Sequence, residues 1–149
     1  RELQHERPVE FSNVTVTPIL VPHRDEYSET VGYLISGPNK TALFIPDINK
    51  WEIWERDIAE EIRAVDYALV DASFFDADEL PGRNIADIPH PLIVESMELF
   101  SELAAIDKAK VWFIHLNHSN PVLNPESAAH QRVTAQGFNV AKEGVRLPL

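Results

Sequence analysis

Short runs of apolar residues in the first third of the chain are typical of β-strands. Residues 11–21 are rich in β-branched side chains, and residues 31–36 and 41–45 are two further runs of the same kind. The segment Gly37-Pro38-Asn39-Lys40 has the composition of a tight turn. This pattern predicts one strand over 11–21 followed by a β-hairpin over 31–45.

After Pro46 the periodicity changes to that of helices alternating with buried strands. Apolar residues at three- and four-residue spacing predict two helices. The first is a surface helix of about three turns, with Ile53, Trp54, Ile58 and Ile62 on its apolar face. The second follows later in the chain, with Ile93, Met97, Phe100 and Ala104 on its apolar face. Residues 67–72 and 110–116 are continuous apolar runs that predict two buried strands.

The last part of the chain predicts one more helix and a hairpin. Asn124 is a good N-cap and Pro125 suits a first helical turn, while Gly137 would end the helix. Residues 138–141 and 145–147 would then pair around a turn at 142–144. No linker or internal repeat divides the sequence, so we expect residues 1–149 to form one unit of the α/β class with a mixed sheet.

A polar residue ends the apolar run in three of the predicted strands: Asp47 after TALFIP, Asp71 after YALV and His115 after VWFI. Ligands in open α/β sheets bind at the carboxyl ends of strands, and a buried carboxylate must be hydrogen-bonded or bound to a cation. Any one of these residues could simply cap a helix or end a turn. The three together predict a candidate site at one edge of the sheet.

Histidines mark the loops around this edge. His90 lies between two prolines, where it could donate a proton or cap a helix. His115 and His118, three residues apart, have a spacing that can chelate a metal. His118 and Asn120 in this loop, and His23 at the head of a polar loop, are candidate substrate contacts. The alternative for His23 is a solvated loop residue.

The composition of the chain limits the reactions and binding partners that it can have. The 149 residues include no cysteine, which excludes thiolate ligands and nucleophiles. A net charge of −11 without basic clusters argues against nucleic acid and anionic membranes as partners. No apolar stretch is long enough to span a membrane and the first residues do not form a signal peptide, so we expect a cytoplasmic protein. Arg1 in place of Met suggests a natural chain that is longer or processed.

A family resemblance follows from five segments: PHRDEYSETVGYLI, ALFIPD, YALVDASFF, IPHP and VWFIHLNHSNP. From about Val14 onward the chain resembles the second half of the metallo-β-lactamase superfamily. Its C-terminal segment, IHLNHSNPVLNPES to GFNVAKEGVRL, resembles the pyrroloquinoline quinone biosynthesis B family. The resemblance implies an αββα sandwich that holds one or two metal ions, of which residues 1–149 form the C-terminal half.

The resemblance also implies roles for individual residues. Asp47 corresponds to the aspartate that bridges two metals, and His115 to the last histidine ligand. Asp71 corresponds to an acidic residue that orients a catalytic histidine, here His90. His118 stands where the quinone-biosynthesis proteins usually have Asn.

The His-x-His-x-Asp-His motif of the superfamily does not occur in this sequence. The missing ligands would therefore come from an upstream half of the fold or from a second chain, and the chain alone would bind metal through only two residues. Carboxylate and imidazole ligands suit zinc, and also iron or manganese.

The sequence is compatible with three functions. The first is a metal-dependent hydrolase that acts on a small-molecule ester-type substrate through hydroxide generated at the metal. The second, implied by the quinone-biosynthesis resemblance, is an iron-dependent oxidative enzyme. The third is a half-domain without activity that serves interaction or folding. The intact Asp47 favours the hydrolase.

Overall fold

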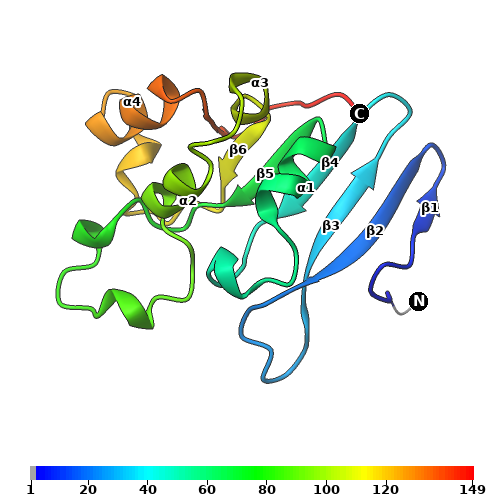
Figure 1. Ribbon diagram of the computed structural model, residues 1–149, viewed down its shortest axis with the longest axis horizontal. Coiled ribbons are helices and arrows are strands. Elements are labelled where there is room, and N and C mark those ends of the chain that lie inside the picture. The colour runs from blue at the N-terminus through cyan, green and yellow to red at the C-terminus, as the bar shows by residue number, and fades with distance from the viewer. Residues whose placement is uncertain (1–2) are drawn as a thin grey trace.

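Seven strands form one mixed sheet in the computed structural model, which describes residues 3–149 (Figure 1). Their order in the sheet follows the chain: β1 (Val9–Phe11), β2 (Val14–Val21), β3 (Thr30–Ser36), β4 (Thr41–Ile45), β5 (Tyr67–Asp71), β6 (Val111–Ile114) and β7 (Asn139–Val140). The strands β1 to β4 pair antiparallel, and β4 to β7 pair parallel. The α/β class with a mixed sheet is confirmed. Arg1, which suggested a longer natural chain, lies outside the described residues.

The hairpin predicted over 31–45 is present as β3 and β4, where the Gly37 N–H donates to the Lys40 carbonyl at 2.9 Å. The strand predicted over 11–21 is present as β2, but it begins at Val14 rather than at Phe11. Ser12 adopts a left-handed conformation with φ 56°, and the chain turns there so that β1 folds back on β2. The turn places β1 at the edge of the sheet.

The surface helix predicted over 53–62 is interrupted. A 3₁₀ turn, η1 (Trp51–Ile53), is separated from α1 (Ile58–Ala64) by an extended segment. Asp57 starts α1, since its carboxylate accepts hydrogen bonds from the N–H groups of Ala59 and Glu60. The predicted apolar positions in α1 are buried, but Ile53 is 59% exposed because it belongs to the separate turn.

The second predicted helix is divided in the same way, into α2 (Ile93–Leu99) and α3 (Ala105–Lys108), and Leu103 is buried in place of Ala104. The helix predicted from Asn124 begins later, as α4 (Ala128–Ala135). Its N-cap is Ser127, whose Oγ accepts from the His130 N–H at 3.1 Å. Gly137 follows the helix with φ 90°, as predicted.

The hairpin predicted at the C-terminal end is wrong. Asn139–Val140 pairs in parallel with β6, and within residues 3–149 no strand forms over 145–147. The Asn139 side chain fixes this pairing by donating to the carbonyls of Ala109 and Val111. Three 3₁₀ turns complete the described elements: η2 (Ala77–Glu79), η3 (Ile85–Asp87) and η4 (Pro121–Leu123).

The two faces of the sheet differ in burial. One face packs into the core through Leu43, Ala68 and Val111, which are fully buried and share a register. Helices cover this core, and Figure 1 shows α1 in front of β4 and β5. The alternate positions form a second apolar row across four strands that is only partly buried; it consists of Tyr33, Phe44, Leu69 and Trp112.

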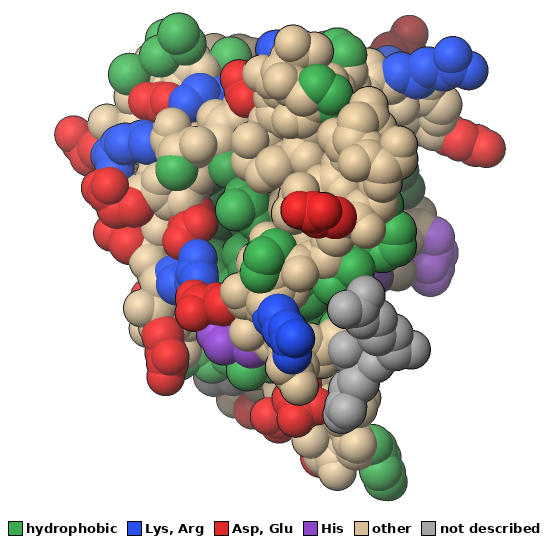
Figure 2. Space-filling model, turned by 90° about the vertical axis from the view of Figure 1, so that its right-hand side faces the viewer, with side chains coloured by type: hydrophobic (Ala, Val, Ile, Leu, Met, Phe, Trp, Pro, Cys, Tyr) green, Lys and Arg blue, Asp and Glu red, His purple; other side chains and the backbone are tan. Residues whose placement is uncertain are grey.

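The surface beside β1 carries both signs of charge. Figure 2 shows acidic and basic side chains interspersed there, with apolar atoms between them. Phe11 on the edge strand is 58% exposed. Within residues 3–149, no helix has the length and apolar character that crossing a membrane requires.

Candidate metal centre

The three polar residues predicted at one edge of the sheet do meet there. Asp47 follows β4, Asp71 ends β5 and His115 follows β6, and these strands are parallel neighbours. One potential ligand atom from each lies within 4.8 Å of the other two. The structure therefore confirms that these residues share one edge.

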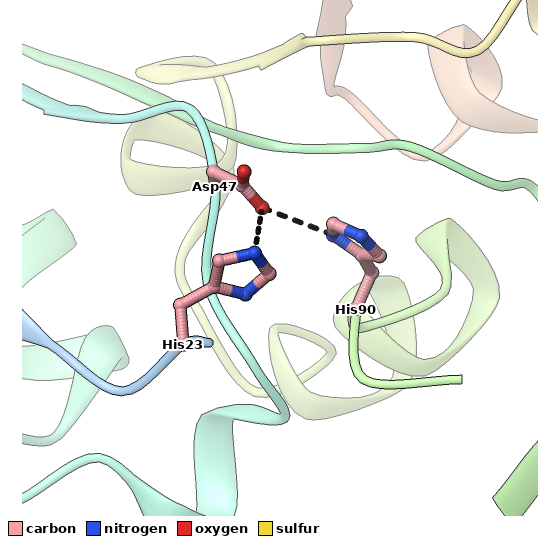
Figure 3. A group of neighbouring side chains, drawn as sticks. All are labelled: His23, Asp47 and His90. Carbon is pink, nitrogen blue, oxygen red and sulfur yellow. Dashed lines mark ion pairs between the residues drawn. The ribbon is translucent and has the colours of Figure 1, made fainter. Parts of the chain in front are cut away.

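Asp47 also meets two histidines from other loops, drawn in Figure 3. His23 Nε2 and His90 Nδ1 each lie 3.3 Å from the Asp47 Oδ1 atom, and the three residues could together hold a metal ion. Asp47 Oδ1 is buried, yet no group in residues 3–149 makes a well-aligned hydrogen bond to it. Both imidazole nitrogens are near this oxygen but neither directs an N–H at it. A buried carboxylate oxygen without a hydrogen-bond donor fits coordination to a cation.

Asn49 holds His23 in place. The Asn49 N–H donates to the Pro22 carbonyl at 2.7 Å, and its side-chain Oδ1 lies 3.0 Å from His23 Nδ1. If Nδ1 carries the proton and donates to Asn49, the lone pair of Nε2 is free to bind a metal beside Asp47, which is the usual arrangement of a metal-binding histidine. His23 was expected to contact substrate, and the structure instead brings it to the candidate ligands. Asn49 was not identified from the sequence.

Asp71 is fully buried, and donors within the chain occupy both of its oxygens. Oδ1 accepts from the Ser73 N–H at 2.9 Å and from its Oγ–H at 2.8 Å. Oδ2 accepts from the Ile48 N–H at 3.1 Å and lies 2.8 Å from His90 Nδ1. With no oxygen free, Asp71 is a positioning residue rather than a metal ligand.

The surroundings of Asp71 keep it charged. Burial opposes ionisation, but the neighbouring His115 and His90 and the Ser73 N–H outweigh it and lower the pKa of Asp71 to about 2. At neutral pH the centre therefore contains a buried carboxylate whose charge faces two imidazole rings.

His90 is better placed to transfer a proton than to bind metal through Nδ1. Its Nδ1 is closer to Asp71 Oδ2, at 2.8 Å, than to Asp47 Oδ1, at 3.3 Å. A proton on Nδ1 therefore bonds to Asp71, and Nε2 remains to exchange a second proton. Phe74 packs edge-on against the ring with centroids 6.1 Å apart. A carboxylate that orients a histidine in this way is the arrangement of a general acid or base.

His115 has an unusual backbone. It follows β6 with φ 59°, a left-handed conformation that is uncommon outside glycine and often marks functional sites. Its Nδ1 lies 3.3 Å from Ser73 Oγ and 3.9 Å from Asp71 Oδ1. The Asp71 carboxylate raises the pKa of His115, acting through its charge because 3.9 Å is too long for a hydrogen bond, and Asp47 adds to this effect.

Asn120, in the loop after His115, supports the fold and has no polar atom left for substrate. Asn120 is 2% exposed; its Nδ2 donates to the carbonyls of Ala72 and Ser73, and its Oδ1 accepts from the Val122 N–H. Substrate binding by Asn120 is wrong, because its polar atoms are buried and used within the chain. His118 is exposed and belongs to neither candidate metal group of the described residues. Ser73 was missed, although Asp-x-Ser is a recognisable turn sequence.

Replacing Asp71 by asparagine should destabilise the metal-free protein in a pH-dependent way. Since the folded-state pKa of about 2 is below the ordinary 3.8, the charged carboxylate stabilises the fold above pH 3.8, and this contribution disappears as the pH falls towards 2. We expect Asp71→Asn to lower the free energy of unfolding at pH 7 by about 2 kcal/mol, measured by urea denaturation, and the difference to vanish near pH 2. The exposed Asp78→Asn is the control. Equal stabilities of Asp71→Asn and the unsubstituted protein at pH 7 would argue against this role.

A sequence profile described as the beta-lactamase superfamily domain matches residues 1–116. Among curated proteins, coenzyme PQQ synthesis protein B of Methylobacterium sp. strain 4-46 is 27% identical over 129 residues, which cover 83% of this chain and 42% of that protein. The protein of the same name from Klebsiella pneumoniae is 30% identical over 93 residues, covering 59% of this chain and 30% of that protein. The chain thus spans less than half the length of these relatives.

Solved structures show the same fold. Zn²⁺-bound PqqB from Methylobacterium extorquens aligns with a TM-score of 0.76 and 22% identity, over 99% of this chain and 55% of that one. The metallo-β-lactamase fold protein YhfI from Bacillus subtilis aligns with a TM-score of 0.59 and 15% identity, over 96% of this chain and 53% of that one. These likenesses confirm the metallo-β-lactamase type of α/β fold predicted from the sequence.

Proposed function

The chain belongs to the beta-lactamase superfamily, and from this premise we propose that it is a metal-dependent enzyme acting on a small molecule at the Asp47 edge of the sheet. The observation that carries the proposal is the buried Asp47 Oδ1, which has no aligned hydrogen bond in the described chain and faces two imidazole nitrogens. Asp47, His23 and His115 are the ligands, because the oxygens of Asp71 are already used within the chain.

Asp47 is common to both groups of potential ligands, as a bridging carboxylate would be. Zinc is the first candidate, since the PqqB neighbour is a zinc-bound structure, and iron or manganese suits the same donors. When bound, a divalent metal would supply an acidified water as nucleophile.

Hydrolysis is the reaction that the geometry of this chain supports best. The Asp71 carboxylate holds the Nδ1–H of His90, so that a proton on Nε2 is available for a leaving group. Buried Ser73 keeps Asp71 in position through two hydrogen bonds. Phosphate esters, thioesters and lactams are the substrate classes in which such a proton transfer helps departure of the leaving group.

The proposal includes a second layer of structure, packed against the partly buried face of the sheet. The partly buried row formed by Tyr33, Phe44, Leu69 and Trp112 is an apolar sheet face that would pack against further structure. The chain also covers only about half of the PqqB structure that it matches. We propose that an N-terminal half of the fold, or a second chain, covers this face and supplies the remaining ligands.

An oxidative reaction is the second candidate, and the named relatives favour it. Both curated relatives described above are coenzyme PQQ synthesis proteins, which supports a role in the synthesis of that quinone. In this second candidate function the metal is iron and the reaction is oxidative.

Metal analysis combined with oxygen electrode measurements on the protein at its natural length separates the two functions. Hydrolysis predicts turnover of ester-type substrates by the zinc form without oxygen uptake. The oxidative function predicts iron and substrate-dependent oxygen uptake. A protein that binds no metal and shows neither activity would contradict both and leave the half-domain without activity.

A further inference from the structure

A pocket with two arginines opens beside the candidate metal centre. Its volume is about 230 Å³, and its lining includes His23, Arg24, Phe74, Arg83, Asp87 and His90. Two of these residues, His23 and His90, are the histidines that meet Asp47. A molecule that reacts at the centre would therefore extend into this pocket.

The arginines come from two separate loops. Arg24 follows His23 directly after β2, whereas Arg83 lies between η2 and η3, where its N–H donates to the Leu80 carbonyl at 3.1 Å. Gly82, with φ 79°, makes the turn that precedes Arg83. The fold thus places two arginines that are distant in sequence on the lining of one pocket.

Neither arginine is neutralised by an ion pair within residues 3–149, in contrast to Arg56 and Arg63, which bind glutamates. Asp87 is the one acidic side chain that lines the pocket, so the two arginines leave a net positive charge there. This is notable in a chain of net charge −11, whose surface repels anions in general. Guanidinium groups recognise phosphate and carboxylate through paired hydrogen bonds.

We propose that Arg24 and Arg83 form an oxyanion subsite that binds a phosphate or carboxylate group of the substrate beside the reacting bond. The inference rests on the proposed function in so far as the pocket opens onto the same centre. It assigns the substrate to the class of small anionic molecules, and it gives the two arginines a role in substrate binding rather than in proton transfer or metal binding.

Binding of inorganic phosphate and of malonate to the metal-free protein tests the subsite without requiring turnover. We expect isothermal titration calorimetry at pH 7 and low salt to detect one site, and the anion that binds more tightly identifies the group. Arg24→Gln and Arg83→Gln should each weaken binding about tenfold, the loss expected for one charge-assisted hydrogen bond, and the double variant should bind neither anion. Arg132→Gln, which removes an exposed arginine on α4, is the matched control.

Two results would overturn the proposed subsite. One is that the unsubstituted protein binds neither anion. The other is that the Arg24→Gln and Arg83→Gln variants bind the anions as tightly as the unsubstituted protein does. A loss of the same size in Arg132→Gln would also overturn it, because binding would then follow general charge. Since no metal is present, these outcomes are independent of whether the proposed enzymatic function is correct.

Discussion

Replacing His115 by alanine in the protein at its natural length should remove a metal ion and nearly all turnover. His115 follows β6 at the edge where Asp47 and Asp71 lie, and one of its ring nitrogens is within 4.8 Å of a carboxylate oxygen from each. A catalytic zinc normally has three protein ligands, so that losing one weakens binding severely. Metal content by mass spectrometry and the rate of ester hydrolysis measure the two effects.

His118→Ala is the matched control for this substitution. His118 lies three residues further along the same loop, is exposed, and belongs to neither candidate metal group of the described chain. It should keep the metal content of the unsubstituted protein. Circular dichroism checks that the variant is folded, because alanine must adopt the same left-handed φ of 59°. Full metal content and full turnover in His115→Ala would exclude it as a ligand.

His90→Ala should leave the metal content unchanged and lower the rate by about 10²–10⁴-fold, the usual contribution of a positioned acid or base. The hydrogen bond from Nδ1 to Asp71 leaves Nε2 as the atom that gives up a proton. The loss should be smaller for substrates with good leaving groups, since these need less protonation in the transition state. Rates for a series of esters with leaving groups of graded pKa measure this dependence.

The series contains its own control, because a general loss of structure would slow all substrates equally. Asp71→Asn should show the same dependence on the leaving group, since Asp71 acts by orienting His90. Equal losses for good and poor leaving groups, or loss of metal from His90→Ala, would reject the role of proton donor.

The sequence predicted the central strands and the shared edge because both depend on local patterns. Apolar runs specify β4, β5 and β6, and parallel neighbours end at the same edge, which brought Asp47, Asp71 and His115 together. Helix boundaries were missed where several residues could serve as the cap. Ser127 starts α4 in place of Asn124, and Asp57 separates α1 from the preceding turn.

The role of His23 could have been inferred from topology. β2 and β4 both pair antiparallel with β3, so they run in the same direction and their carboxyl ends share an edge. His23 and Asp47, each the second residue after its strand, therefore meet. Asn120 offered no such signal, because whether an amide binds substrate or supports a loop depends on tertiary contacts, here with Ala72 and Ser73.

Zinc titration of the metal-free protein at its natural length tests whether Asp47 holds a metal ion. We expect the unsubstituted protein and the control Asp78→Asn to bind at least one equivalent of zinc, and Asp47→Asn to lose this binding, because Asp47 belongs to both groups of potential ligands. Zinc binding by Asp47→Asn with undiminished affinity, or no zinc binding by the unsubstituted protein, would show that Asp47 is not a metal ligand.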